Sequence, residues 1–189
     1  MAADLAGNDI EAVGIPITGF LAYSPMPGAT IPSPAEGASD DLALVDFHKA
    51  GLLKRGGGFE WTEEPDGDPL EFWQDGYSVP TGLANVTLTF TAAEESPVTR
   101  ELRTGKTPDV NGYLTVDGGG NTKTYAFFTE EAYRNGAIRR RCAVGRVQTA
   151  KLQKNERGEV QGIEFTIEVR RNSAFDDEHY GEWVINPED

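Results

Sequence analysis

The chain has 189 residues, of which 38% are hydrophobic, enough for one folded domain with its own core. Its 17 basic and 31 acidic residues give a net charge of −14, which argues against a protein that coats nucleic acid. No apolar run reaches the roughly 18–20 residues of a membrane helix, and the N-terminus lacks the pattern of a secretory signal. The single cysteine, Cys142, excludes an intramolecular disulfide and a multi-cysteine zinc site, so we expect synthesis in a reducing cytoplasm.

The charges are segregated along the chain. The net charge is −11 over residues 1–75, −3 over 76–133, +6 over 134–172 and −6 over 173–189. A chain with a basic third quarter and acidic ends has the means to attract copies of itself. The alternative is that these blocks disperse over the folded surface.

The periodicity of the chain is mainly that of β-strands. The two clearest strands are 85–91 and 163–169, where apolar residues alternate strictly with polar ones. Weaker patterns bounded by turn residues predict further strands over 15–23, 59–62, 70–79, 113–116, 122–128 and 138–148. The sequence therefore predicts a mainly β fold.

One short α-helix is expected within this β pattern. Ser96 is a suitable N-cap, Pro97 suits the first helical position, and Gly105 stands where a glycine commonly ends a helix. Val98 and Leu102 are four residues apart and would face the core from the same side.

The segment 24–41 differs in kind, because it contains four prolines and almost no periodicity. It cannot form a central strand and is longer than most loops that only connect two elements. Its few large apolar residues, Met26 and Ile31, bury too little to offset the entropy of ordering the segment alone, about 1–2 kcal/mol per residue. The segment is either a disordered insertion or an arm that orders against a neighbouring subunit, and we expect the arm.

Catalytic and metal-binding motifs are absent from the sequence. The stretch 105–107 (Gly-Lys-Thr) lacks the earlier glycine of a phosphate-binding loop, and His48 and His179 lack metal-ligand spacing. No serine stands in a G-x-S-x-G pattern, although a Ser–His–Asp site is set by geometry and stays open. We therefore expect no enzymatic activity, no cofactor and no metal.

Two further groups of residues have competing interpretations. Cys142 follows three arginines, which would lower the pKa of an exposed thiol, but in a strand we expect it to point inward as a small apolar residue. Trp61, Trp73 and Tyr77 would suit a sugar-stacking platform, whereas aromatic residues of a core or an interface are the commoner explanation.

Several of these elements occur in a known order. The stretch 68–79 has an aromatic-Gln pair, 84–91 is a Thr-rich strand, and 94–105 is a short helix that ends at glycine. A Gly112-Tyr113 pair, the strand 122–128, an Asn135-Gly136 turn before a basic strand and a closing strand over 162–169 follow. Over residues 58–172 this order resembles the major tail (tail tube) proteins of long-tailed, non-contractile bacteriophages, especially those that infect actinobacteria.

The resemblance implies a β-sandwich or barrel-like subunit with one flanking helix. In that family, hexameric rings stack head-to-tail into a tube whose inner wall is a continuous sheet. It further implies a virion protein that surrounds the tape-measure protein, meets tail terminator and distal tail proteins at its ends, and later passes DNA. We expect one tail tube domain over 1–172, including the arm 24–41, then an acidic C-terminal tail over 173–189, without membrane anchoring.

The expected assembly interface contains Arg139, Arg141 and Arg146 together with Met26 and Ile31 of the arm. In a strand, Arg139 and Arg141 share one face, and we expect them to meet acidic residues of a neighbouring subunit. The alternative is a solvated basic face, with exposed ion pairs worth about 0–1 kcal/mol each.

Rival functions remain open at this point. One is a carbohydrate-binding or receptor-binding β-sandwich that uses the three aromatic residues named above. Another is a different virion part, such as a capsid decoration protein or a tail completion protein.

Overall fold

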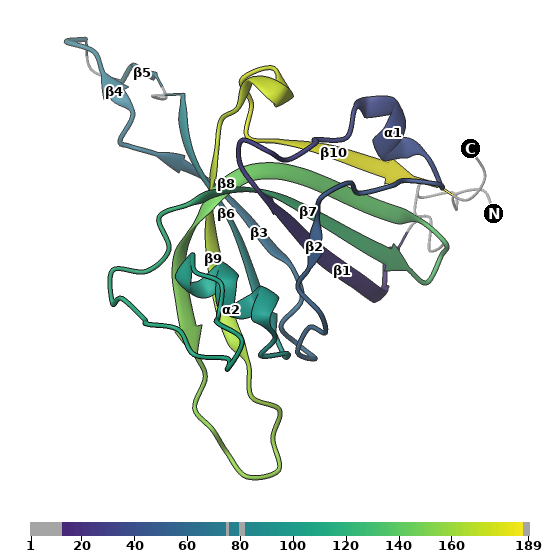
Figure 1. Ribbon diagram of the computed structural model, residues 1–189. Coiled ribbons are helices and arrows are strands. Elements are labelled where there is room, and N and C mark those ends of the chain that lie inside the picture. Colours follow the sequence, from purple (N-terminus) through teal and green to yellow (C-terminus); the bar gives the residue numbers. More distant parts are fainter. Residues whose placement is uncertain (1–12, 75, 80–81, 187–189) are drawn as a thin grey trace.

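The structure, a computed structural model, describes residues 13–74, 76–79 and 82–186. These residues confirm a mainly β fold: one antiparallel sheet of eight strands, a two-stranded sheet and two short α-helices (Figure 1). In chain order the elements are β1 (Pro16–Pro25), α1 (Pro34–Ala38), β2 (His48–Lys49), β3 (Glu60–Asp66), β4 (Leu70–Glu71), β5 (Ser78–Val79), β6 (Leu83–Ala92), α2 (Pro97–Thr104), β7 (Thr124–Tyr133), β8 (Ile138–Leu152), β9 (Ile163–Arg170), the 3₁₀ turn η1 (Ser173–Phe175) and β10 (Tyr180–Ile185).

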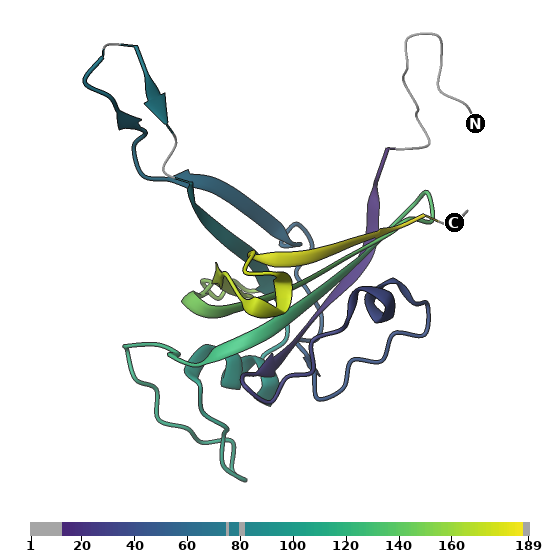
Figure 2. The ribbon, with the colours of Figure 1, turned by 90° about the horizontal axis from the view of Figure 1, so that it is seen from above.

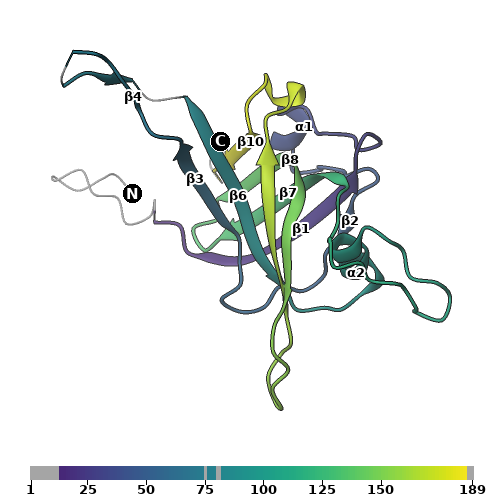
Figure 3. The same cartoon turned by 90° about the vertical axis from the view of Figure 1, so that its left-hand side faces the viewer.

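The large sheet is organised around β8. Its strands follow the order β2-β1-β7-β8-β9-β6-β3, and β10 also pairs with β8. One edge of β8 pairs with β7 as far as Arg146. The other edge pairs first with β10, as far as Ala143, and then with β9 from Val144 onward. This change of partner splits the sheet into two parts that share β8, seen from the side in Figure 3.

Both parts of the sheet contribute to a single core. Tyr23 of β1 meets the ring of Tyr125 of β7 edge-on, at 5.3 Å between centroids. In the other part, Phe90 of β6 stacks on Phe165 of β9 at 5.2 Å. All four side chains belong to one buried cluster, so the sheet curves around its core, as the expected sandwich or barrel-like fold requires.

Helix α2 lies where the sequence predicts a helix. The Ser96 side chain accepts a hydrogen bond from the Thr99 N–H, and Gly105 ends the helix with a φ of 69°, in the left-handed region that favours glycine. Leu102 is fully buried in the core. The Tyr23 hydroxyl donates to the Val98 carbonyl at 2.7 Å, which ties α2 to β1.

Other predictions of secondary structure need correction. The strand expected over 70–79 is two strands of two residues, β4 and β5, which form a hairpin, and 113–116 is a loop without a strand. No pattern in the sequence indicated β2 or β10. Because β10 belongs to the large sheet, much of the expected acidic tail 173–189 is instead part of the domain.

The proline-rich segment is packed against its own subunit, whereas the sequence predicted an arm that orders against a neighbouring subunit. Residues 26–47 link β1 to β2, and we call them the strap; α1 lies within it. Ser33 and Glu36 form a capping box at the start of α1. The Trp183 indole N–H of β10 donates to the Pro34 carbonyl at 2.8 Å, and Gly37 lies so close to that indole that no side chain would fit.

A buried arginine of β8 anchors the strap to the sheet. Arg140 of β8 is 4% exposed and donates hydrogen bonds to the carbonyls of Gly37 at 2.9 Å and Ser39 at 2.7 Å. Its Nε also contacts the Glu130 carboxylate at 2.7 Å. Charge-assisted hydrogen bonds to the strap backbone thus supply stabilisation that its few apolar residues cannot.

We predict that Arg140→Ala destabilises the protein by about 3 kcal/mol, the lower end for a broken buried pair because Glu130 stays partly exposed. The strap should then be cleaved faster by proteases, since its carbonyl groups lose their donors. Urea unfolding and limited proteolysis measure the two effects. Arg146→Ala is the matched control and should cost about 0–1 kcal/mol, because its pair with Glu168 is half exposed. Equal protease resistance of the two variants would contradict this role of Arg140.

Cys142 lies on the strap side of β8 and is fully buried, which confirms that it points inward. Burial raises the pKa of its thiol to about 12. At pH 8 the buried thiol is therefore protonated. We predict that a maleimide leaves the folded protein unlabelled at pH 8 and labels it fully in urea; rapid labelling of the folded protein would contradict this burial.

Candidate assembly surfaces

A continuous polar surface covers one side of four neighbouring strands. These strands are β3, β6, β9 and the part of β8 beyond Arg146, which lie side by side in Figure 3. Their other side faces the core, so the two-residue period of a strand places polar residues outward. We call this surface the polar face, and its outward side chains are Glu60, Thr62, Glu64, Asn85, Thr87, Thr89, Glu164, Thr166, Glu168, Arg170, Arg146, Thr149 and Lys151.

The charges of the polar face are nearly balanced. It carries four glutamates against two arginines and one lysine, among threonines that stand in neighbouring rows. Arg146 binds Glu168 at 2.8 Å, and its hydrogen bond holds the pKa of that carboxyl below its usual range. Arg170 contacts the same carboxylate at 3.4 Å. The outward side chains named above are therefore all polar, and the surface they form is hydrated.

The polar face ends in two unpaired strand edges. No strand of the described residues pairs with the outer edge of β3, and none pairs with β8 on its β7 side beyond Arg146. The β3 edge is acidic, with Glu60, Glu63 and Glu64 exposed. Such edges carry unsatisfied N–H and C=O groups and are templates for pairing with another strand.

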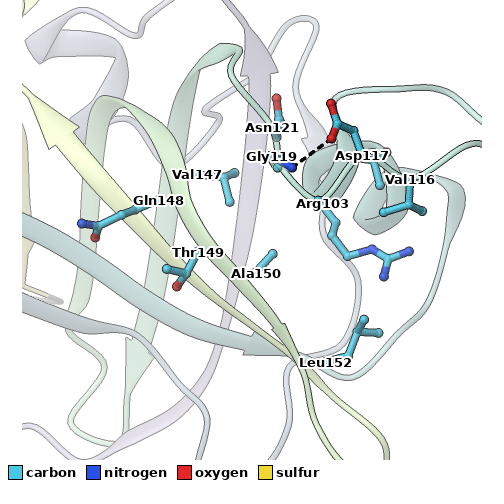
Figure 4. A pocket seen from close by; sticks show the side chains of 13 residues that line it. Arg103, Val116, Asp117, Gly119, Asn121, Val147, Gln148, Thr149, Ala150 and Leu152 are labelled. Carbon is cyan, nitrogen blue, oxygen red and sulfur yellow. Dashed lines mark hydrogen bonds between the residues drawn. The ribbon is translucent and has the colours of Figure 1, made fainter.

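An open cavity of about 330 Å³ lies along the free edge of β8 (Figure 4). It is bounded by residues 147–150 of β8, by the glycine-rich loop 116–121 and by Arg103 at the end of α2. The Nε of Arg103 is buried and has no hydrogen-bond partner among the described residues. This edge carries Arg103, Arg146 and Lys151 against Asp117, an excess of basic residues, although Arg146 is paired with Glu168.

An aromatic cluster fixes the position of the acidic edge. Trp61 of β3 packs on Tyr180 of β10 at 4.9 Å between ring centroids, and the Tyr180 hydroxyl donates to Glu63. Burial, together with this hydrogen bond, raises the pKa of Tyr180 to about 12. Arg141 lies over the Trp61 ring at 5.3 Å. The cluster thus joins β3, β8 and β10 on the core side of the sheet.

The predicted interface residues lie in different places. Arg139 and Arg141 share one face of β8, as expected, but both contact Glu182 of β10 in their own subunit, at 3.3 and 3.0 Å. Arg146 lies on the polar face, beside the free edge of β8. Met26 and Ile31 are half-buried in the strap, and the Met26 N–H donates to the Thr124 carbonyl at 3.0 Å.

The structure does not assemble the expected sugar platform. Trp61 is packed against the core, whereas Trp73 and Tyr77 lie on the β4–β5 hairpin, which projects from the sheet (Figure 1). Within the described residues, no cluster of three His, Cys, Asp or Glu side chains is placed to hold a metal ion. None of the described helices has the length and apolarity needed to cross a membrane.

The sequence carries a signal for the polar face in its rows of threonine. Threonines alternate with apolar residues in the strand 85–91 and again at Thr166. Such rows point to an exposed sheet face, but the two strands that carry them, β6 and β9, are separated by more than 70 residues. Comparison with known proteins adds no relative: no protein-family model and no curated protein matches the chain.

Proposed function

We propose that the chain is a structural subunit that assembles with copies of itself into a tube, as the tail tube proteins of long-tailed phages do. The observation that carries this proposal is the polar face with its two free edges of opposite charge. A heterologous contact needs two different complementary surfaces on one subunit. The acidic β3 edge and the basic β8 edge meet that condition.

The strand directions also suit closure into a ring. The four strands β8, β9, β6 and β3 alternate in direction, because every pairing between them is antiparallel. In copies related by rotation, β3 of one copy would therefore run antiparallel to β8 of the next. The sheet would continue across each junction with the same pattern of pairing. The resemblance supplies the expected number of six copies per ring.

In such a ring the polar face would line the channel. Its threonines and balanced charges offer no excess of cations to hold phosphate groups, so DNA would pass without strong binding. Before DNA passage the channel would hold a tape-measure protein, and tail terminator and distal tail proteins would close the ends. The proposed location is the tail of a virion.

We predict that the purified protein forms rings or tubes at high concentration and moderate salt. Negative-stain electron microscopy and light scattering measure this directly. Because the two edges carry opposite charges, higher salt should weaken the assembly. A monomer that persists at high concentration in low and moderate salt would contradict the proposal.

We further predict that Gln148→Pro blocks assembly and leaves the monomer folded. Gln148 is exposed and lies at a register shift in β8, where it has no partner in β9, so the fold tolerates proline there. The proline removes a backbone donor from the free edge and adds a bulky ring beside it. Gln148→Ala is the matched control and should assemble normally. Circular dichroism checks the fold of both variants, and tubes from Gln148→Pro would exclude edge pairing at β8.

A further inference from the structure

An exposed apolar surface lies on the β4–β5 hairpin, which we call the hairpin tip. Trp73 is 97% exposed and Tyr77 is 70% exposed. Further apolar side chains exposed on the hairpin tip are Leu70, Phe72 and Val79. A hairpin of two short strands cannot bury such side chains by itself. Exposed aromatic residues gathered in this way indicate a contact with another molecule.

A second exposed apolar surface lies where the chain enters β1 and leaves β10. Val13, Ile15, Ile17 and Val184 are each more than half exposed, and we call them the end patch. They lie on either side of the turn between β7 and β8, because Arg134 donates its N–H to the Ile15 carbonyl and Val184 pairs with Arg139. A small cavity of about 170 Å³ opens between Gly14 and Val184.

The two surfaces are complementary in charge and lie at opposite ends of the subunit. The acidic side chains Asp68 and Glu71 are exposed beside the hairpin tip. The basic residue Arg134 is exposed beside the end patch. Figures 1 and 2 show the hairpin and the start of β1 on opposite sides of the molecule. One subunit therefore cannot cover its own end patch with its own hairpin tip.

We infer that the hairpin tip of one copy docks on the end patch of a second copy. Both surfaces belong to one chain, so each added copy presents a new hairpin tip and the contact repeats head-to-tail. Trp73 would be the central residue of this contact, as large aromatic residues commonly are where they enter a pocket. The contact deepens the proposed function and rests on it, because it supplies a second junction besides the sheet edges.

A mixing experiment tests this docking. One batch of protein carries Ser78→Cys and another carries Thr18→Cys, which replace exposed polar residues beside the hairpin tip and the end patch and leave the apolar side chains in place. A short bis-maleimide is added to each batch and to their mixture. Cys142 does not compete, because it is buried. The mixture should give a cross-linked dimer at least tenfold in excess of either batch alone. The matched control pairs Thr18→Cys with Val160→Cys, which is 59% exposed in the loop between β8 and β9.

Each result has a definite meaning. A yield equal to that of the Val160 control overturns the docking, and so does a preference for cross-links between two copies of the Ser78→Cys variant. Tubes of the unmodified protein without the 78–18 cross-link would leave the proposed function in place and remove only this contact. The cross-link without tubes would support this contact and contradict the proposed function. As a second measurement, Trp73→Ala should weaken association on the order of thirtyfold, the effect of a hot-spot residue, while Val160→Ala should leave it unchanged.

Discussion

The exchange of partners along β8 is the constraint on which the rest of the structure depends. Beyond Ala143, this strand stops pairing with β10 and pairs with β9 instead. Gly145 lies at this point, and a side chain there would collide with the Glu168 carbonyl of β9. Because β9 approaches so closely, the sheet turns here and encloses the core. The same turn leaves the last residues of β8 without β7, which creates the free basic edge.

The face of β8 opposite the core explains why the strap is ordered. Phe128, Cys142 and Trp183 form a second, smaller apolar surface on that face, which the strap covers beside the Gly37 backbone. The strap brings few apolar side chains, so hydrogen bonds from Arg140 and Trp183 to its carbonyl groups replace them. An isolated arginine in this position would be costly, and the contact with Glu130 offsets that cost.

Much of the fold was predictable from the sequence, because it depends on local patterns. Alternation in 85–91 and 163–169 identified β6 and β9, and Ser96 with Gly105 located α2. The strap and β10 were not predictable, because their stability depends on contacts distant in sequence. Arg140 reaches the Gly37 carbonyl across 103 positions, and the Trp183 indole reaches Pro34 across 149. The composition of 24–41 shows that the segment is rich in proline. It does not show that distant side chains donate hydrogen bonds to its backbone carbonyl groups.

The candidate interfaces, like the fold, were predictable only in part, because the contacts of each charged residue depend on segments distant in sequence. The basic block 134–172 predicted an interaction surface, yet β8 distributes its arginines to three surroundings. Arg140 donates hydrogen bonds to the strap, and Arg141 contacts Glu182 and the Trp61 ring. Arg146 lies on the polar face, where it pairs with Glu168. Successive residues of a strand point to opposite sides, so a run of like charges cannot act as one patch. The charge available to a neighbouring copy is therefore decided by the strands and loops packed against each side of β8.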